Sequence, residues 1–284
     1  MLDHASYSGD ERFLSERAIP MARETLRYFD ARFARDENGV LVISPTQAVE
    51  TYWHGVVNDA PTVAGLRAVT QMLIALPERF GSKDDRALWK RVHDACPALP
   101  LETVDGKLVA SAAEKFDHKR SNCETPELYA LWPFRLYGPG RPNLDAAIRA
   151  FEKRTDRSTV GWTQDGLFAA TLGLTEQAKA NLLARSRNSR AAFRFPAMWG
   201  PNFDWLPDQC HGGNLMSGLQ LMLMQCDGET IRLLPAWPME WNATFKLHAP
   251  GNTIVQGRVH NGKVEDLQVS PESRRAHIVI GPQQ

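Results

Sequence analysis

The chain carries between Trp199 and Asn214 the run WGPNFDWLPDQCHGGN, which leads into the apolar segment 215–226. Two carboxylates, one imidazole and two indoles lie within this run, whose prolines and glycines predict a structured loop. Apolar residues then recur at helical spacing, which predicts a helix with Asn214 as its N-cap. Acids and indoles at the mouth of a helix favour a sugar site, because carboxylates transfer protons and aromatic faces stack on sugars. A linker with turn prolines and buried tryptophans has the same composition, so both interpretations stay open.

Composition argues against several classes of protein. The 284 residues include 33 basic and 33 acidic side chains, and this balance argues against nucleic acid or an anionic membrane as a partner. No apolar run approaches the ~20 residues that span a bilayer, and residues 1–10 lack the apolar core of a signal peptide. The four cysteines form no C-x-x-C pair, which predicts free thiols, and we expect neither a metal nor a cofactor.

The chain divides by pattern into a helical part and a strand-rich part. Helical periodicity predicts helices over 11–33 (one or two helices), 60–76, 84–95, 126–137, 144–154, 163–172, 176–187 and 215–226. Segment 44–55 is expected to be a loop, and Asp105-Gly106 indicates a hairpin turn. After residue 228, short alternating or β-branched segments flank the turn signal Asn261-Gly262. We therefore expect a mainly α domain over 1–228 and a small β-sandwich-like module over 229–284.

Four segments resemble glycoside hydrolase family 95, in the family's order. Residues 39–50 (GVLVISPTQAVE) resemble the strand and loop that carry the general-acid glutamate of that family. Residues 127–133 (ELYALWP) resemble a helix that ends in Leu-Tyr-x-Leu-(Tyr/Phe)-Pro, and Gly161-Trp162 resembles a helix start. Residues 231–241 (IRLLPAWPMEW) resemble the entry into the family's C-terminal β module.

The resemblance implies an (α/α)6 toroid of six helical hairpins that hydrolyses glycosides with inversion. In that family the substrates are α-L-fucosides and related L-galactosides. Fewer helices are predicted here than a complete toroid needs, so we expect a partial toroid, the C-terminal portion of a longer enzyme. The upstream hairpins would supply paired asparagines that orient the attacking water. Without them we expect exposed apolar stripes on 11–33 and 60–76, low solubility or oligomers, and little hydrolysis.

The resemblance places the general acid at Glu50, beside the aromatic pair Tyr52-Trp53. An acid that holds its proton near neutral pH needs a partly desolvated setting, which neighbouring indoles would supply. The family's base motif is Asp-Gly-Asn-Phe-Gly, whereas residues 207–214 read PDQCHGGN. Asp208 is the candidate base and Asp204 its rival, although either aspartate is equally suited to cap a turn.

Further residues of suitable chemistry are candidates for sugar binding. The carboxylate of Glu124 precedes a predicted helix, where it would also stabilise the helix N-terminus. A single histidine without ligand-spaced partners is more often a hydrogen-bonding group than a metal ligand. The candidate substrate-binding residues are Trp53, His54, Glu124, Trp199, Asp204, Trp205, His211 and Asn214.

Two other functions compete with glycoside hydrolysis. A non-catalytic carbohydrate-binding or inactive truncated fragment would use the same indoles without a working acid and base. A toroidal polysaccharide lyase needs a Tyr/His/Arg set, of which only Tyr52, His54 and His211 are near the acids in sequence. We expect an oligosaccharide or polysaccharide partner, and the sequence leaves the sugar, its linkage, the oligomeric state and the compartment open.

Overall fold

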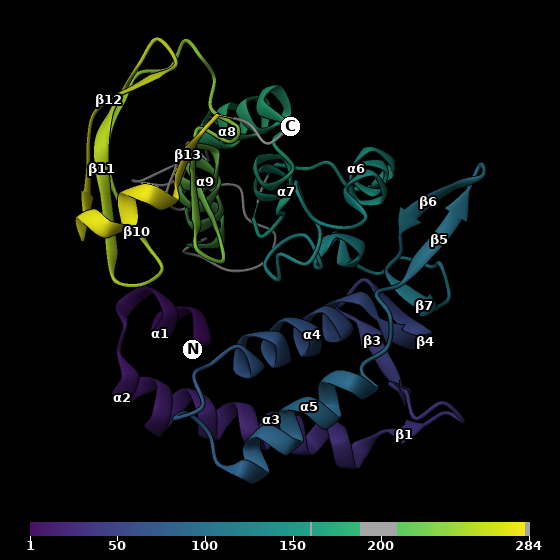
Figure 1. Cartoon of the computed structure of the whole chain (residues 1–284). Coiled ribbons are helices and arrows are strands. Elements are labelled where there is room, and N and C mark those ends of the chain that lie inside the picture. Colours follow the sequence, from purple (N-terminus) through teal and green to yellow (C-terminus); the bar gives the residue numbers. More distant parts are fainter. Residues whose placement is uncertain (160, 188–208, 282–284) are drawn as a thin grey trace.

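The computed structural model describes residues 1–159, 161–187 and 209–281 of the chain. Figure 1 shows the N-terminal helices on one side of the molecule and the C-terminal strands on the other. The helices are α1 (Leu2–Ser8), α2 (Glu11–Phe13), α3 (Ile19–Arg32), α4 (Ala60–Ile74), α5 (Lys83–Ala95), α6 (Leu144–Lys153), α7 (Asp165–Thr171), α8 (Thr175–Arg187) and α9 (Gln209–Leu223). A π-helical turn, Leu14–Ala18, joins α2 to α3.

The helices α3, α4 and α5 form the N-terminal body, in which α5 packs against both α3 and α4 (Figure 1). The side chain of Asp59 caps α4, and Ser82 and Asp85 form a capping box at the start of α5. Arg23 of α3 forms an ion pair with Asp85, which is almost fully buried. These local signals explain why 60–76 and 84–95 form helices as predicted.

The apolar stripes of this body pack on one another. Leu26 of α3, Leu73 of α4 and Trp89 of α5 are fully buried in one hydrophobic cluster. The expectation that the stripes on 11–33 and 60–76 meet water is therefore wrong for these core positions. The large apolar residues of these two segments that are exposed are Met21, Tyr28 and Ile74.

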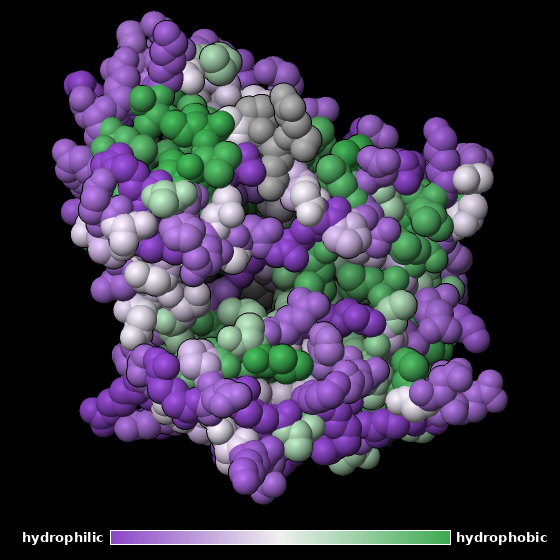
Figure 2. All heavy atoms as spheres, in the orientation of Figure 1, coloured by the Kyte–Doolittle hydropathy of each residue, from purple (hydrophilic) through white to green (hydrophobic). Residues whose placement is uncertain are grey.

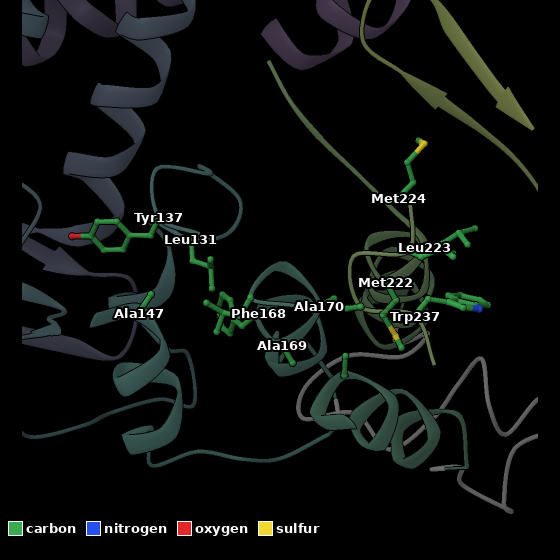
Figure 3. Packing of buried hydrophobic residues seen from close by; sticks show 14 of the residues in the cluster. Leu131, Tyr137, Ala147, Phe168, Ala169, Ala170, Met222, Leu223, Met224 and Trp237 are labelled. Atoms are coloured by element: carbon green, nitrogen blue, oxygen red, sulfur yellow. The ribbon is translucent and has the colours of Figure 1, made fainter. Parts of the chain in front are cut away.

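A second body contains α6, α7, α8 and α9 and the core shown in Figure 3. Phe168 of α7 and Met222 of α9 are buried at its centre, and Leu131 reaches it from the segment before α6. The strands β8 (Met224–Asp227), β9 (Thr230–Leu233) and β13 (Ile278–Ile280) form a sheet in the order β13-β9-β8. This core therefore joins helices and sheet.

The remaining C-terminal strands form an antiparallel sheet of β10 (Ala243–Ala249), β11 (Thr253–His260) and β12 (Lys263–Ser270). Asn261 and Gly262 both have positive φ and form the turn between β11 and β12, as the sequence predicts. Backbone amides of Gly251 and Asn252 donate to carbonyls of α1, which connects the two ends of the described chain. The boundary at 228/229 stays a prediction, although β8 pairs with β9 across it.

Three predictions of local structure are wrong. Segment 44–55 forms the hairpin of β3 (Thr46–Ala48) and β4 (Tyr52–Asp59), and β4 also pairs with β7 (Ala113–Lys115). Segment 126–137 contains only a 3₁₀ turn, Pro126–Leu128, because Pro133 lacks an amide donor and disfavours helix in the residue before it. Asn214 lies inside α9 and does not cap it, because the helix begins at Gln209, within the run predicted as a loop, and it ends at Leu223 rather than at residue 226.

The predicted hairpin at Asp105-Gly106 is confirmed by β5 (Leu101–Val104) and β6 (Lys107–Ala110). No helix in the described ranges is long and apolar enough to cross a membrane. A partial toroid stays a prediction, since the helices and small sheets establish a mainly helical architecture without a closed ring.

Candidate functional site

Glu50 lies in the turn of the β3–β4 hairpin and is exposed. The residue before it, Val49, has φ of 47°, a left-handed conformation that is unfavourable for a β-branched side chain. The side-chain amide of Asn122 donates to Glu50 Oε2 at 2.9 Å, which fixes the carboxylate. The hairpin therefore presents Glu50 to solvent in a strained and hydrogen-bonded turn, and such strain is concentrated at functional sites.

The partly desolvated acid expected at Glu50 is found instead at Glu124. Its side chain is half-buried, and Oε2 accepts a hydrogen bond from Thr51 Oγ1 at 2.8 Å. Burial raises the pKa of Glu124, the negative charge of Glu50 raises it further, and the Thr51 hydrogen bond opposes this shift. The expectation of a desolvated Glu50 is therefore wrong, because its side chain lies at the surface.

The segment 117–124 runs beside the hairpin and holds it. The amide of Ser121 donates to the Thr51 carbonyl at 2.8 Å, and the amide of Asp117 donates to the His54 carbonyl at 2.9 Å. Arg120 Nη2 donates to the carbonyls of Asn122 and Glu124 at 3.2 and 2.9 Å. Together, Glu50, Thr51, Asn122 and Glu124 form the hairpin site.

Trp53 and His54 also lie on the exposed part of this hairpin. The indole of Trp53 is 52% exposed, and its Nε1 donates to the Glu50 carbonyl. His54 is exposed beside it. Both predicted sugar contacts therefore lie on the same hairpin as Glu50.

His211 and Asn214 lie in a different environment at the start of α9. His211 is 2% exposed, and its Nε2 lies 3.0 Å from the Arg185 carbonyl. Arg185 is equally buried and donates to the carbonyls of Gly161 and Thr163 at 2.9 and 2.6 Å. His211 is thus held inside the protein by these groups, and its contact with a sugar stays a prediction.

Asn214 belongs to the same polar group. Its Nδ2 donates to the Thr163 carbonyl at 3.2 Å, and its side chain is half-buried. These bonds join α9 to the turn that contains Gly161-Trp162. The buried cluster consists of Arg185, His211, Asn214 and the backbone of Gly161 and Thr163.

Four sequence candidates lie outside the described residues: Trp199, Asp204, Trp205 and Asp208. Their roles stay predictions. Within the described ranges there is no group of three or more His, Cys, Asp or Glu side chains that is suited to hold a metal ion.

No sequence motif marks several residues of this region. Thr51 and Asn122 contact the two carboxylates from segments about seventy residues apart, and no local pattern marks them. Glu127 has a buried Oε2 without a hydrogen-bond partner, and burial raises its pKa to about 7.

The large cavities lie elsewhere. Two adjoining cavities of about 660 and 560 Å³ share Tyr7, Arg135 and Cys226 in their walls, and Figure 2 shows a hollow in this central part of the surface. None of the described site candidates lines either cavity. Glu124 and Asn214 line two small cavities of about 10 Å³ each, which is room for no more than one water. The hairpin site is therefore an open surface site within the described part of the chain.

Comparison with protein families gives a match over most of the chain. Residues 1–203 match the glycosyl hydrolase family 95 catalytic domain. The solved structure of "Putative kojibiose phosphorylase from human microbiome" is similar, with a TM-score of 0.56 and 12% sequence identity. The match covers 93% of this chain and 41% of that protein, so the chain spans less than half of its length. At this identity the likeness shows a shared fold alone. A comparison with curated proteins gave no match.

Proposed function

The chain belongs to glycosyl hydrolase family 95, and we propose on this premise that it hydrolyses a glycosidic bond with Glu50 as general acid. The proposed substrate is an α-L-fucoside or related L-galactoside within an oligosaccharide or polysaccharide. Glu50 donates its proton to the glycosidic oxygen, so that the leaving sugar departs as an alcohol.

One observation carries this proposal. The matched region contains an exposed carboxylate in a strained turn, held by Asn122 and adjacent to a second carboxylate, Glu124. A surface glutamate without a role needs neither the unfavourable φ of Val49 nor a fixed orientation. The arrangement supports a group that must meet a substrate atom from one direction.

The proposed base is Asp208, with Asp204 as its rival. Inversion requires room for a water between acid and base, so their carboxyl groups should stand ~6.5–9.5 Å apart. Trp53 and His54 are the proposed sugar contacts next to Glu50, since the exposed indole offers a face for stacking. A direct sugar contact by Glu124 stays a prediction.

The leaving group of the substrate provides the test. Glu50→Gln should lower kcat/KM on a natural linkage by about 10²–10⁴-fold and much less on a glycosyl fluoride, which needs little proton donation. Glu78→Gln, at an exposed glutamate outside the site, is the matched control and should leave both rates unchanged. Equal rates for Glu50→Gln and the parent on both substrates would reject Glu50 as the acid. The anomer formed, followed by NMR, separates inversion from retention.

Phosphorolysis is the second candidate, because the structural neighbour is named a kojibiose phosphorylase. Turnover measured with and without inorganic phosphate separates the two reactions: hydrolysis proceeds without phosphate, and phosphorolysis yields a sugar phosphate. The non-catalytic alternative is tested by calorimetry. Sugar binding without turnover on any aryl glycoside or glycosyl fluoride would support it.

A further inference from the structure

We propose that the larger of the two adjoining cavities, about 660 Å³ in volume, binds an anionic saccharide at a site separate from the hairpin site. This volume lies within the range of ~300–1,000 Å³ that is usual for small-molecule sites. The anionic group is argued from the side chains that line the cavity. The choice of a saccharide also rests on the proposed function of the chain.

The larger cavity lies where three parts of the chain meet. Tyr7 of α1 lines it from the N-terminal part, residues of the segment 132–141 line it from the middle, and β8, β9 and β10 contribute from the C-terminal part. The hollow in the central part of the surface in Figure 2 lies in this region. Because residues distant in sequence surround one space, its walls are set by the tertiary fold rather than by a single loop.

Cations outnumber acids in the described lining of this cavity. Arg135, Arg141, Arg232 and Lys246 line it together with the acid Asp227. The described lining of the smaller cavity is nearly balanced, with Asp3, Asp10, Glu11 and Asp227 beside Arg79, Arg135 and Arg141. The excess of positive charge is therefore confined to the larger cavity, where it favours an anionic ligand.

Ion pairs within the protein account for only part of this positive charge. Arg141 Nε lies 3.1 Å from Asp227 Oδ2, and Arg135 Nη2 lies 2.8 Å from Asp3 Oδ1. Lys246 is exposed on β10 and forms no ion pair with any residue in the described ranges. A ligand can therefore reach the ammonium group of Lys246 without breaking an internal ion pair.

The segment that carries Arg135 is held by its own backbone. The amides of Leu136 and Tyr137 both donate to the Ala130 carbonyl, at 2.7 and 3.0 Å. Arg135 has φ of 54°, a left-handed conformation that is uncommon for a residue with a Cβ atom. Because these bonds fix the segment before any ligand arrives, less conformational entropy is lost when a ligand binds.

The rest of the wall suits a sugar. The indole of Trp132 is half-buried in the lining and offers an apolar surface to the C–H groups of a sugar ring. Ser217 and Gln220, both exposed on α9, line the same cavity and can exchange hydrogen bonds with sugar hydroxyls. A small inorganic anion has no C–H face for the indole, so the lining favours an anionic group carried on a sugar.

The proposal is tested by NMR titration at low ionic strength with glucose 6-sulfate, glucuronate, glucose and sodium sulfate as probes. The anionic sugars should bind saturably, and the tighter of them identifies sulfate or carboxylate as the preferred group. Glucose and sodium sulfate should bind about tenfold more weakly, and added salt should weaken the binding of the anionic sugars. Equal affinity for glucose, equal affinity for sodium sulfate, or no binding of either anionic sugar would overturn the inference.

Variants then locate the bound sugar. Lys246→Gln should weaken the binding of the anionic sugars by about fivefold, and Lys246→Arg, which keeps the charge, should retain most of the affinity. Lys263→Gln, at an exposed lysine of the same sheet outside the cavity, is the matched control and should bind as the parent does. An unchanged affinity in a folded Lys246→Gln variant would overturn the inference.

Glu50→Gln separates this inference from the proposed function, because binding is measured without turnover. This variant should bind the anionic sugars with the affinity of the parent, even where its hydrolysis is lost. Loss of binding in Glu50→Gln would place the sugars at the hairpin site and overturn the inference. Full activity of Glu50→Gln would reject only the proposed acid.

Discussion

The hairpin site and the buried cluster are both rich in polar residues, but their polar groups differ in what they contact. In the buried cluster the guanidinium of Arg185 donates to backbone carbonyls, and His211 and Asn214 bond to neighbouring backbone. In the hairpin site the carboxylate of Glu50 is held by one amide and otherwise faces solvent. The comparison shows that polar residues in a sequence are available for a ligand only where their side chains lie at the surface and still have free hydrogen-bond donors or acceptors.

The largest expected effect concerns the buried cluster. Arg185→Met removes the guanidinium donor from the buried carbonyls of Gly161 and Thr163, and should lower the free energy of unfolding by about 3 kcal/mol. Arg187→Met, at an exposed position of the same helix, is the matched control and should change it by less than about 0.5 kcal/mol.

Urea denaturation of these two variants and Glu50→Gln measures the contrast. Glu50→Gln should unfold at the same urea concentration as the parent, because its side chain is exposed. If Arg185→Met were as stable as the parent, the division into a structural cluster and a functional hairpin would fail.

Glu127 tests whether a raised pKa by itself marks a functional group. Burial raises its pKa from 4.5 to about 7, so the folded state holds the proton more tightly than the unfolded state. The stabilisation is complete below the unfolded value and is lost as pH rises from 4.5 through about 7. Glu127→Gln stays neutral, and its stability relative to the parent should rise by about 3 kcal/mol between pH 4 and pH 8.

Denaturation at several pH values, with Glu78→Gln as control, measures this effect. A parent and Glu127→Gln with parallel pH profiles would show that the carboxylate is hydrated in solution. In that case Glu127 would join the hairpin site as an accessible acid close to Tyr52 and Arg120.

Local signals in the sequence predict much of this fold. The helix 60–76 follows from its periodicity and from the cap at Asp59, and the turn at Asn261-Gly262 follows from its dipeptide. The hairpin at 44–55 was missed, because its strands are short and its polar composition is that of a loop. The segment 126–137 was wrongly predicted as helix because its apolar residues are spaced like one, although Pro126 and Pro133 limit it.

The candidate site was predicted less completely than the fold. Glu50 and Glu124 were both identified, but the hydrogen bonds that hold them run across some seventy residues, which no periodicity encodes. His211 was assigned to sugar binding because its neighbours are acids and indoles. Its hydrogen-bond partner in the described structure, the carbonyl of Arg185, lies in another helix. Long-range contacts of this kind decide whether a polar residue is structural or available.

A smaller effect on stability is expected for Thr51, because this residue of the hairpin site also stabilises the fold. Thr51→Val removes the hydroxyl that donates to Glu124 and should cost about 1 kcal/mol of unfolding free energy. Thr51→Ser keeps the hydroxyl and should cost less. If Thr51→Val were as stable as the parent, the hydrogen bond from Thr51 to Glu124 would contribute little to folding.

The smallest effect on stability is expected for Trp53, whose proposed role is in binding rather than in folding. Trp53 is 52% exposed, whereas Trp89 is fully buried in the N-terminal body. Trp53→Ala should change the free energy of unfolding by about 0.5 kcal/mol or less, while Trp89→Ala should cost about 3 kcal/mol or more. If the exposed indole face stacks on a sugar next to Glu50, Trp53→Ala should weaken binding by about 1 kcal/mol, measured by calorimetry with a fucoside. An unchanged affinity in Trp53→Ala would place the sugar on another side of Glu50. The hairpin would then supply the proposed acid but not an aromatic surface for stacking.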